Sequence, residues 1–133
     1  MQELFFSVLI PLFVIMKTVV LGASMHSSRY SNQAVKLLRA YRHEVIAVGK
    51  ETGKISDVEI ETSFPENEKI DTVTMYLNPL HQKDYYEKII SAKPRRIIFN
   101  PGAENSELEI LAERNGIKTE EACTLVLLNT GQY

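Results

Sequence analysis

Short apolar runs rich in β-branched residues recur along the chain and predict strands. These runs occupy residues 17–23, 44–48, 58–61, 72–77, 96–100 and 117–121. The run at 58–61 is the weakest, and it lies in a mostly polar stretch between residues 50 and 71. Five main strands and one weaker strand are therefore expected.

The segments between these strands carry apolar residues at helical spacing. After the cap candidates Ser27 and Ser28, one stripe falls at i, i+3, i+4 and i+7 and predicts a helix facing the core. This stripe consists of Ala34, Leu37, Leu38 and Tyr41. Asn78 followed by Pro79 predicts the start of a second helix, because proline favours the first helical position. Its inward residues are expected to be Tyr86, Ile89 and Ile90.

A third helix is predicted over residues 104–115, where Leu108, Leu111 and Ala112 share one face and Gly116 supplies the C-terminal stop. Residues 123–128 form an apolar turn or a short helix. Strands that alternate with helices over short connections predict parallel pairing through right-handed crossovers. The expected fold is therefore a single α/β domain of Rossmann-like type, with a doubly wound, mainly parallel sheet and helices on both faces.

Ligands of such sheets bind beyond the carboxyl ends of the strands, at the point where the strand order reverses. This rule directs attention to four loops. They lie at residues 22–30, 49–50, 77–79 and 100–104.

The first sixteen residues differ from the rest of the chain. Leu4 to Met16 is an apolar run of thirteen residues broken only by Ser7 and Pro11, which is shorter than the roughly 20 residues of a membrane-spanning helix. No basic segment precedes this run, so a signal peptide is not expected either. We expect residues 1–16 to be an extension upstream of a true start at Met16 and residues 17–133 to form the domain. The alternatives are that the run packs against a partner chain, in a homodimer or with another protein, which is the second choice, or that it is an interfacial anchor.

Composition and charge narrow the classes of partner. The chain of 133 residues holds one domain, and 15 Lys and Arg against 17 Asp and Glu give a net charge of −2. The longest basic run is Arg95-Arg96, so neither nucleic acid nor an anionic membrane is an expected partner. A single cysteine, Cys123, excludes an intramolecular disulfide and is compatible with a cytoplasmic location.

The first loop carries the clearest chemistry. It reads Gly22-Ala23-Ser24-Met25-His26-Ser27 at the position where a dinucleotide-binding turn would read G-x-G-x-x-G, and only the first glycine is present. The start of the following helix could bind a pyrophosphate through free N–H groups. Hydroxyl groups and the cation of Arg29 would assist. The alternative is a plain connection in which the serines cap the helix.

The second loop bears on the choice of nucleotide. An NAD-binding fold places an acidic residue at the end of its second strand, whereas this chain reads Val48-Gly49-Lys50. A lysine there suits the ribose 3′-phosphate of coenzyme A or the 2′-phosphate of NADP. The alternative is a solvated surface lysine.

Catalytic and metal-ligating residues are not expected. The three histidines are dispersed, and no H-x-x-x-H, H-E-x-x-H or C-x-x-C spacing occurs. Cys123 and His26 could form a thiolate pair if they meet at the ligand edge, but a small buried cysteine is the expected alternative. Glu104 could accept a hydrogen bond from a ribose or pantetheine, or simply favour the helix start.

Several segments, taken in order over residues 17–133, resemble small stand-alone CoA-binding domain proteins, which are similar to the CoA-binding domain of the succinyl-CoA synthetase alpha subunit. The segments with this resemblance are Val20–Ser24, Arg29–Ala34, His43–Val45, Ile70–Val73, Ile98–Asn105 and Ala122–Val126. The N-P-G-x-E-N run and the closing C-T-L-V run are the specific ones. The chain departs from the family in having Arg42 where a glycine usually stops the helix, and in lacking a usual glycine near Asp57.

The resemblance implies coenzyme A as the ligand, with its pyrophosphate over Gly22 to Ser24 and its adenosine end near Val48 to Lys50 and Tyr76 to Pro79. The residues expected at the ligand are Gly22, Ala23, Ser24, Ser28, Arg29, Tyr30, Ser31, Val48, Gly49, Lys50, Tyr76, Asn78, Pro79, Asn100, Pro101, Gly102 and Glu104. We expect a module that binds or senses CoA or acyl-CoA without catalytic activity of its own. The alternative is an NADP-dependent oxidoreductase-like domain.

Overall fold

The computed structural model of the protein describes residues 16–133. The extension expected over residues 1–16 lies, apart from Met16, outside the described residues. Seven strands form one sheet in the order β3-β4-β2-β1-β5-β6-β7. They are β1 (Lys17–Ala23), β2 (Glu44–Gly49), β3 (Gly53–Ile55), β4 (Val58–Glu61), β5 (Thr72–Met75), β6 (Arg96–Phe99) and β7 (Lys118–Glu121).

Every strand pair is parallel except the hairpin of β3 and β4 at one edge. The mainly parallel, Rossmann-like α/β fold predicted from the sequence is therefore confirmed. Strand β3 was not predicted, because three residues are too few to produce a periodic pattern. The tight turn of its hairpin passes through Ser56, whose φ of 56° is left-handed.

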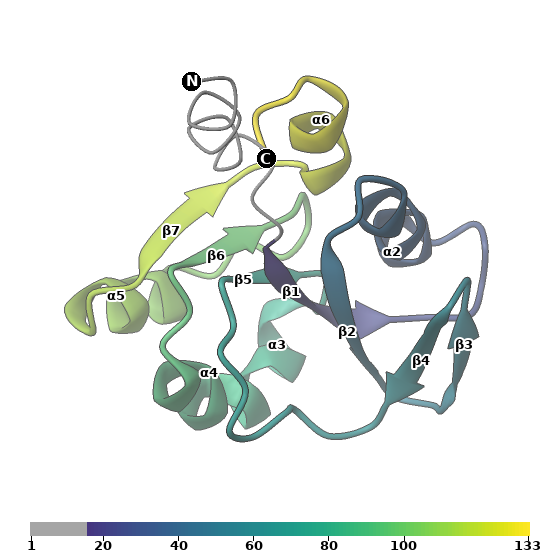
Figure 1. Ribbon diagram of the computed structural model, residues 1–133. Helices are drawn as coiled ribbons and strands as arrows, with labels where there is room; N and C mark the ends of the chain where they lie inside the picture. Colours follow the sequence, from purple (N-terminus) through teal and green to yellow (C-terminus); the bar gives the residue numbers. More distant parts are fainter. Residues whose placement is uncertain (1–15) are drawn as a thin grey trace, which may run out of the picture.

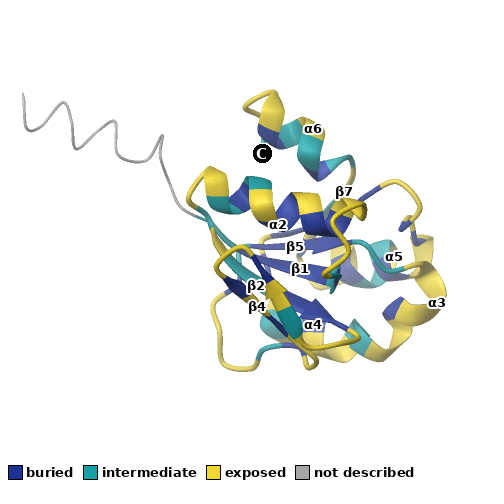
Figure 2. Cartoon of the chain, turned by 90° about the vertical axis from the view of Figure 1, so that its right-hand side faces the viewer, coloured by how far each residue is buried: buried dark blue, intermediate teal, exposed yellow. Residues whose placement is uncertain are grey.

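Helices cover both faces of the sheet (Figure 1). They are α2 (Tyr30–Ala40), α3 (Pro79–Gln82), the 3-10 turn η2 (Lys83–Tyr85), α4 (Tyr86–Ala92), α5 (Ser106–Arg114) and α6 (Thr124–Asn129). One core cluster lies between the sheet and α4 and α5, and a second lies between the sheet and α2 and α6. Figure 2 shows the buried central strands between these two layers.

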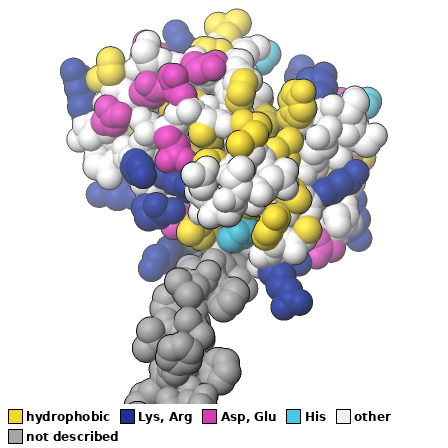
Figure 3. All heavy atoms as spheres, turned by 90° about the horizontal axis from the view of Figure 1, so that it is seen from above, with side chains coloured by type: hydrophobic (Ala, Val, Ile, Leu, Met, Phe, Trp, Pro, Cys, Tyr) yellow, Lys and Arg dark blue, Asp and Glu magenta, His cyan; other side chains and the backbone are white. Residues whose placement is uncertain are grey.

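The side of the molecule that carries α6 is seen in Figure 3, where hydrophobic side chains gather across the middle and charged side chains of both signs surround them. The exposed hydrophobic residues of the described chain include Val126 on α6 and Tyr41 at the end of α2. Strands β5 and β6, in contrast, are buried on both faces, as parallel strands between two helical layers usually are.

Three details differ from the sequence-based expectation. Tyr41 does not continue the buried stripe of α2, because the helix ends at Ala40 and the tyrosine is exposed. The buried face of α2 instead begins with polar residues and consists of Ser31, Asn32, Ala34, Val35 and Leu38. The predicted second helix is divided into α3, η2 and α4, and the predicted third helix begins only after Asn105.

Candidate functional site

The strand order reverses at β1, which pairs with β2 on one side and β5 on the other. The chain runs from β1 through α2 to β2, and it later crosses to the opposite side of β1 to form β5. The segments that follow β1 and β5 therefore diverge at the carboxyl edge of the sheet. This is the position at which ligands of doubly wound sheets bind.

Gly22 shapes the start of the first loop, residues 22–30. Its φ is +102°, and the pairing of β1 with β2 shifts register between Leu21 and Ala23. A Cβ at this position would lie 3.1 Å from the backbone nitrogen of Leu77 and 3.2 Å from the carbonyl carbon of Tyr76. The space beside this glycine is thus occupied by the protein's own backbone.

Internal hydrogen bonds hold the first loop in a compact form. The Ser24 hydroxyl accepts a bond from the His26 N–H at 3.1 Å, and the Ser24 carbonyl accepts one from the Asn32 side chain at 2.9 Å. The Arg29 N–H donates to the His26 carbonyl at 3.0 Å. The loop is therefore formed before any ligand arrives.

Helix α2 begins without a side-chain cap. Arg29 is its N-cap residue, so the prediction that Ser27 or Ser28 caps the helix is wrong. Ser27, Ser28, Arg29 and Tyr30 are all exposed at this end of the helix. An uncapped helix start presents N–H groups and a positive partial charge, which is suited to an anion. The Arg29 guanidinium has no hydrogen-bond partner or ion pair among residues 16–133.

Two polar residues of α2 lie beneath this loop. Ser31, one of the predicted site residues, is 4% exposed. Asn32 is 2% exposed and donates to Ser24, while its Oδ1 atom is buried with no partner. Asn32 was not among the predicted site residues, although the Ser31-Asn32 pair in an otherwise apolar helix face was a signal for it.

The segment after β2 brings one side chain to the edge. Val48 and Gly49 are buried, and a Cβ on Gly49 would overlap the carbonyl oxygen of Ala23. Gly49 thus allows β2 to approach the end of β1 closely. Lys50 follows as an exposed residue, and the structure gives it no ion pair within residues 16–133.

The segment after β5 packs against the end of β1. The Tyr76 N–H donates to the Leu21 carbonyl at 2.9 Å. The Tyr76 hydroxyl is buried without a hydrogen-bond partner, and burial raises the pKa of this phenol. Asn78 caps α3 by accepting from the His81 N–H at 3.1 Å, as the sequence predicted, and Pro79 is exposed at the first helical position.

Asn100 ties three elements together below the surface. Its side-chain nitrogen donates to the Thr74 hydroxyl at 2.7 Å and to the Met75 carbonyl at 3.0 Å, and its oxygen accepts from the Thr124 N–H at 2.8 Å. The residue is 2% exposed. Its amide therefore holds β5, β6 and the start of α6 in place, and the side chain has no free group to offer a ligand.

The turn that follows β6 is closed by Glu104. The carboxylate accepts from the Gly102 N–H at 2.8 Å, and the Ala103 N–H donates to the Asn100 carbonyl at 2.8 Å. Pro101, Gly102 and Glu104 are exposed at the edge of the sheet. Glu104 thus acts on its own turn, a contact that the sequence did not predict.

A buried amide network links the segments after β5 and β6, and the sequence did not reveal it. Gln82 donates through Nε2 to the Leu77 and Ala103 carbonyls, each at 2.8 Å. Its Oε1 accepts from the Asn105 side chain at 2.8 Å. The partners lie up to 23 residues apart, so no local pattern identifies this role for Gln82.

Cys123 and His26 do not form a pair in the described part of the chain, because the structure gives no contact between them. Cys123 is half-buried and precedes α6, where its carbonyl accepts from the Leu127 N–H at 2.9 Å. His26 is exposed in the first loop. Among residues 16–133, no group of three or more His, Cys, Asp or Glu side chains could hold a metal ion.

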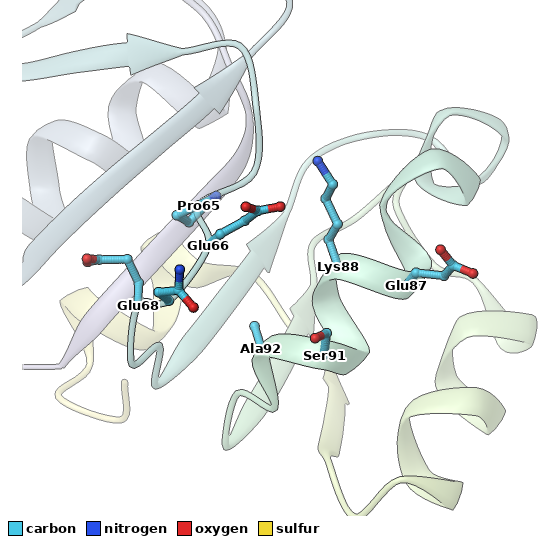
Figure 4. A pocket seen from close by; sticks show the side chains of 8 residues that line it. Pro65, Glu66, Glu68, Glu87, Lys88, Ser91 and Ala92 are labelled. Carbon is cyan, nitrogen blue, oxygen red and sulfur yellow. The ribbon is translucent and has the colours of Figure 1, made fainter.

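Three hollows of the described surface lie away from the candidate site. One hollow of about 470 Å³ lies between residues 65–68 and α4, and its lining includes Glu66, Glu68, Glu87 and Lys88 (Figure 4). A second lies between α4 and α5, and a third lies over β2 and β4. Within the described residues, no helix is long and apolar enough to cross a membrane.

Comparisons with known proteins agree with this architecture. The model of the family described as CoA binding domain matches residues 16–129. A crystal structure of an uncharacterized protein is 42% identical, covers 90% of this chain and 99% of its own, and superposes with a TM-score of 0.87. The cell-free ID.343 protein of Thermus thermophilus shares the fold at 20% identity, covering 99% of this chain and 98% of its own, with a TM-score of 0.79.

A larger protein contains the same fold as one part. The dinucleotide-forming acetyl-coenzyme A synthetase 1 of Ca. Korarchaeum cryptofilum, solved with phosphate and ADP, is 17% identical with a TM-score of 0.66. The match covers 86% of this chain but 27% of the synthetase. A search of curated proteins found no match.

Proposed function

The chain belongs to the CoA binding domain family, and from that premise we propose that it binds coenzyme A or an acyl-coenzyme A at the carboxyl edge of its sheet. The observation that carries the proposal is the uncapped start of α2, with an exposed Arg29, at the point where the strand order reverses. A helix start of this kind favours a pyrophosphate. Membership of the family is the reason for proposing coenzyme A as the ligand that carries this pyrophosphate.

We place the pyrophosphate over the first loop. The exposed residues Ser28, Arg29 and Tyr30 surround the free N–H groups of α2, and Arg29 supplies a cation that no described residue neutralises. We place Gly22 and Ser24 at the base of this position. The loop itself is closed by its own hydrogen bonds. Charge-assisted bonds to a phosphate are shorter and stronger than neutral ones.

We place the adenosine end between Lys50 and the segment Tyr76–Pro79. Lys50 is exposed at the end of β2, where it can pair with the 3′-phosphate that distinguishes coenzyme A from NAD. The pantetheine then extends along the exposed turn Pro101–Gly102 toward Cys123. This direction follows the strand order from β2 through β1 and β5 to β6.

We propose a binding or sensing role with no catalytic step. Support comes from the half-buried thiol of Cys123, which has no contact with His26 within residues 16–133. The comparisons give no support to the NADP-dependent oxidoreductase alternative. Acyl-coenzyme A remains within the proposal, because Pro101 and Gly102 are exposed where the pantetheine end is placed.

Native mass spectrometry of the purified full chain tests the proposal. The protein is mixed in turn with coenzyme A, acetyl-coenzyme A, NAD and NADP at equal concentrations. We expect one bound molecule per chain for the two coenzyme A species and a much smaller bound fraction for the others. Equal occupancy by NADP, or no occupancy by coenzyme A, overturns the proposal.

A further inference from the structure

We propose that Gln82 is a positioning residue for this site, because its buried carboxamide fixes the distance between the segments after β5 and β6. The inference rests on the proposed function. Gln82 itself is 0% exposed and touches no open surface. It would therefore act on the ligand only through Leu77 and Ala103.

The three hydrogen bonds of Gln82 require a carboxamide. Two carbonyl oxygens, those of Leu77 and Ala103, need donors, and the Asn105 side-chain N–H needs an acceptor. A primary amide supplies two donors and an acceptor on one planar group, whereas a carboxylate supplies no donor and a methionine supplies none of the three functions well. All three distances are 2.8 Å, so the group is fully engaged.

The bonded carbonyls belong to the two segments that flank the proposed ligand. Leu77 lies in the segment assigned to the adenosine end, and its backbone nitrogen also packs against Gly22 at the base of the first loop. Ala103 lies in the turn after β6, and its backbone N–H donates to the Asn100 carbonyl at 2.8 Å. A change at Gln82 is thus transmitted to both sides of the site.

The network is braced on its far side. Asn105 donates a second bond to the Tyr86 hydroxyl at 2.8 Å, and its Oδ1 accepts from the Leu108 N–H at 3.2 Å. Tyr86 in turn donates to Glu107 at 3.0 Å near the surface. Helices α4 and α5 therefore hold the Gln82–Asn105 pair in a single orientation, which a positioning role needs.

The test replaces Gln82 with methionine, which keeps the volume and removes the hydrogen bonds. Affinity is measured by calorimetry for coenzyme A and for its adenosine portion, adenosine 3′,5′-bisphosphate. We expect both to bind at least about tenfold more weakly to Gln82→Met, because loss of the bonds releases Leu77. Weakening of coenzyme A with unchanged binding of the bisphosphate overturns the assignment to the adenosine side.

A second destabilised variant separates positioning from general loosening of the fold. Ile117 is buried just before β7, and its apolar side chain takes no part in the hydrogen bonds of the network. Ile117→Ala creates a cavity that lowers stability. At a temperature where both variants are folded by circular dichroism, Ile117→Ala should bind coenzyme A like the unaltered chain. An equal loss of affinity in Ile117→Ala overturns the proposal.

A milder variant covers the case in which Gln82→Met does not fold. Tyr86→Phe removes only the hydroxyl that accepts a hydrogen bond from Asn105. We expect this variant to bind both ligands about threefold more weakly. Normal affinity in Tyr86→Phe would then overturn the proposal. Failure of the unaltered chain to bind coenzyme A overturns the proposed function as well, whereas normal binding by Gln82→Met overturns the positioning role alone.

Discussion

The backbone nitrogen of Leu77 lies 3.1 Å from the point at which a Cβ on Gly22 would stand. The end of β1 thus contacts the segment that follows β5, at the point where the strand order reverses. The sequence placed this glycine at the start of a turn that is expected to bind a pyrophosphate. The structure shows that its missing side chain first lets these two parts of the chain pack together, and the proposed pyrophosphate lies over the loop that this contact supports.

Gly22→Ala should destabilise the fold more than the same substitution at another glycine of positive φ. Gly116 is the matched control, because its φ is +77° and a Cβ there meets no atom within 4 Å. We expect a loss of about 2 to 4 kcal/mol in the free energy of unfolding for Gly22→Ala, from backbone strain and overpacking together. Gly116→Ala should lose about 1 to 2 kcal/mol from strain alone. Urea unfolding measures both, and equal losses would show that the Leu77 contact is unimportant.

Arg29→Ala should weaken coenzyme A by roughly 10 to 100-fold, because a charge-assisted bond to a phosphate contributes about 1.5 to 3 kcal/mol. The exposed side chain has no partner among the described residues, so the fold should keep its melting temperature. Arg114→Ala is the control, since this exposed arginine lies at the last turn of α5. If calorimetry finds similar affinities for the two variants, the pyrophosphate does not bind at this loop.

Lys50→Met tests the contact with the 3′-phosphate. We expect coenzyme A to bind about tenfold more weakly to this variant, while 3′-dephospho-coenzyme A, which lacks that phosphate, binds the variant and the unaltered chain equally. Lys36→Met on the exposed face of α2 should change neither affinity. The same loss for both ligands would mean that Lys50 acts elsewhere on the molecule.

Glu109 on α5 gives the stability a dependence on pH. One of its oxygens is buried without a partner, and burial, together with Glu121 and the nearby Glu113, raises the pKa of this carboxyl to about 7. Between about pH 4.5 and pH 7, the folded protein therefore keeps a proton on Glu109, whereas the unfolded chain, with the ordinary pKa near 4.5, has released it. The stabilising contribution is complete below about pH 4.5 and is lost as the pH rises through 7.

Glu109→Gln mimics the protonated carboxyl at every pH. The variant should match the unaltered chain at pH 4 and be more stable at pH 8, because it avoids ionising a partly buried carboxyl beside Glu121. Glu51→Gln, at an exposed position, should shift stability at neither pH. Thermal unfolding at the two pH values provides the measurement. If Glu109→Gln shows the same difference in stability between pH 4 and pH 8 as the unaltered chain, the titrating group is not Glu109.

Much of the fold was predictable because its strands are dense in β-branched residues, and because Pro94 and Gly116 follow the ends of α4 and α5. The run Arg96–Phe99, for example, is apolar enough to predict a buried strand, and Asn78-Pro79 is a local signal that the structure bears out. Strand β3 was missed because its three residues depend on pairing with β4. The end of α2 at Ala40 was also missed, since the apolar spacing continues through Tyr41.

The candidate site was predictable in its exposed part. Arg29 and Lys50 follow directly after strand and loop signals, and both are exposed at the expected edge. The supporting residues were not predictable in the same way. Gln82 acquires its role from partners that are distant in sequence, and Asn100 uses its whole amide on Thr74, Met75 and Thr124. Such roles depend on tertiary contacts, which a local pattern does not contain.

Calorimetric titration of the full chain with coenzyme A, in parallel with NAD and NADP, tests the central claim most directly. We expect coenzyme A to bind at one site per chain and more tightly than either dinucleotide, because Lys50 stands where an NAD-binding fold has an acidic residue. Arg29→Ala in the same titration should reduce that affinity. Binding of NAD that equals or exceeds the binding of coenzyme A by the unaltered chain would contradict the account.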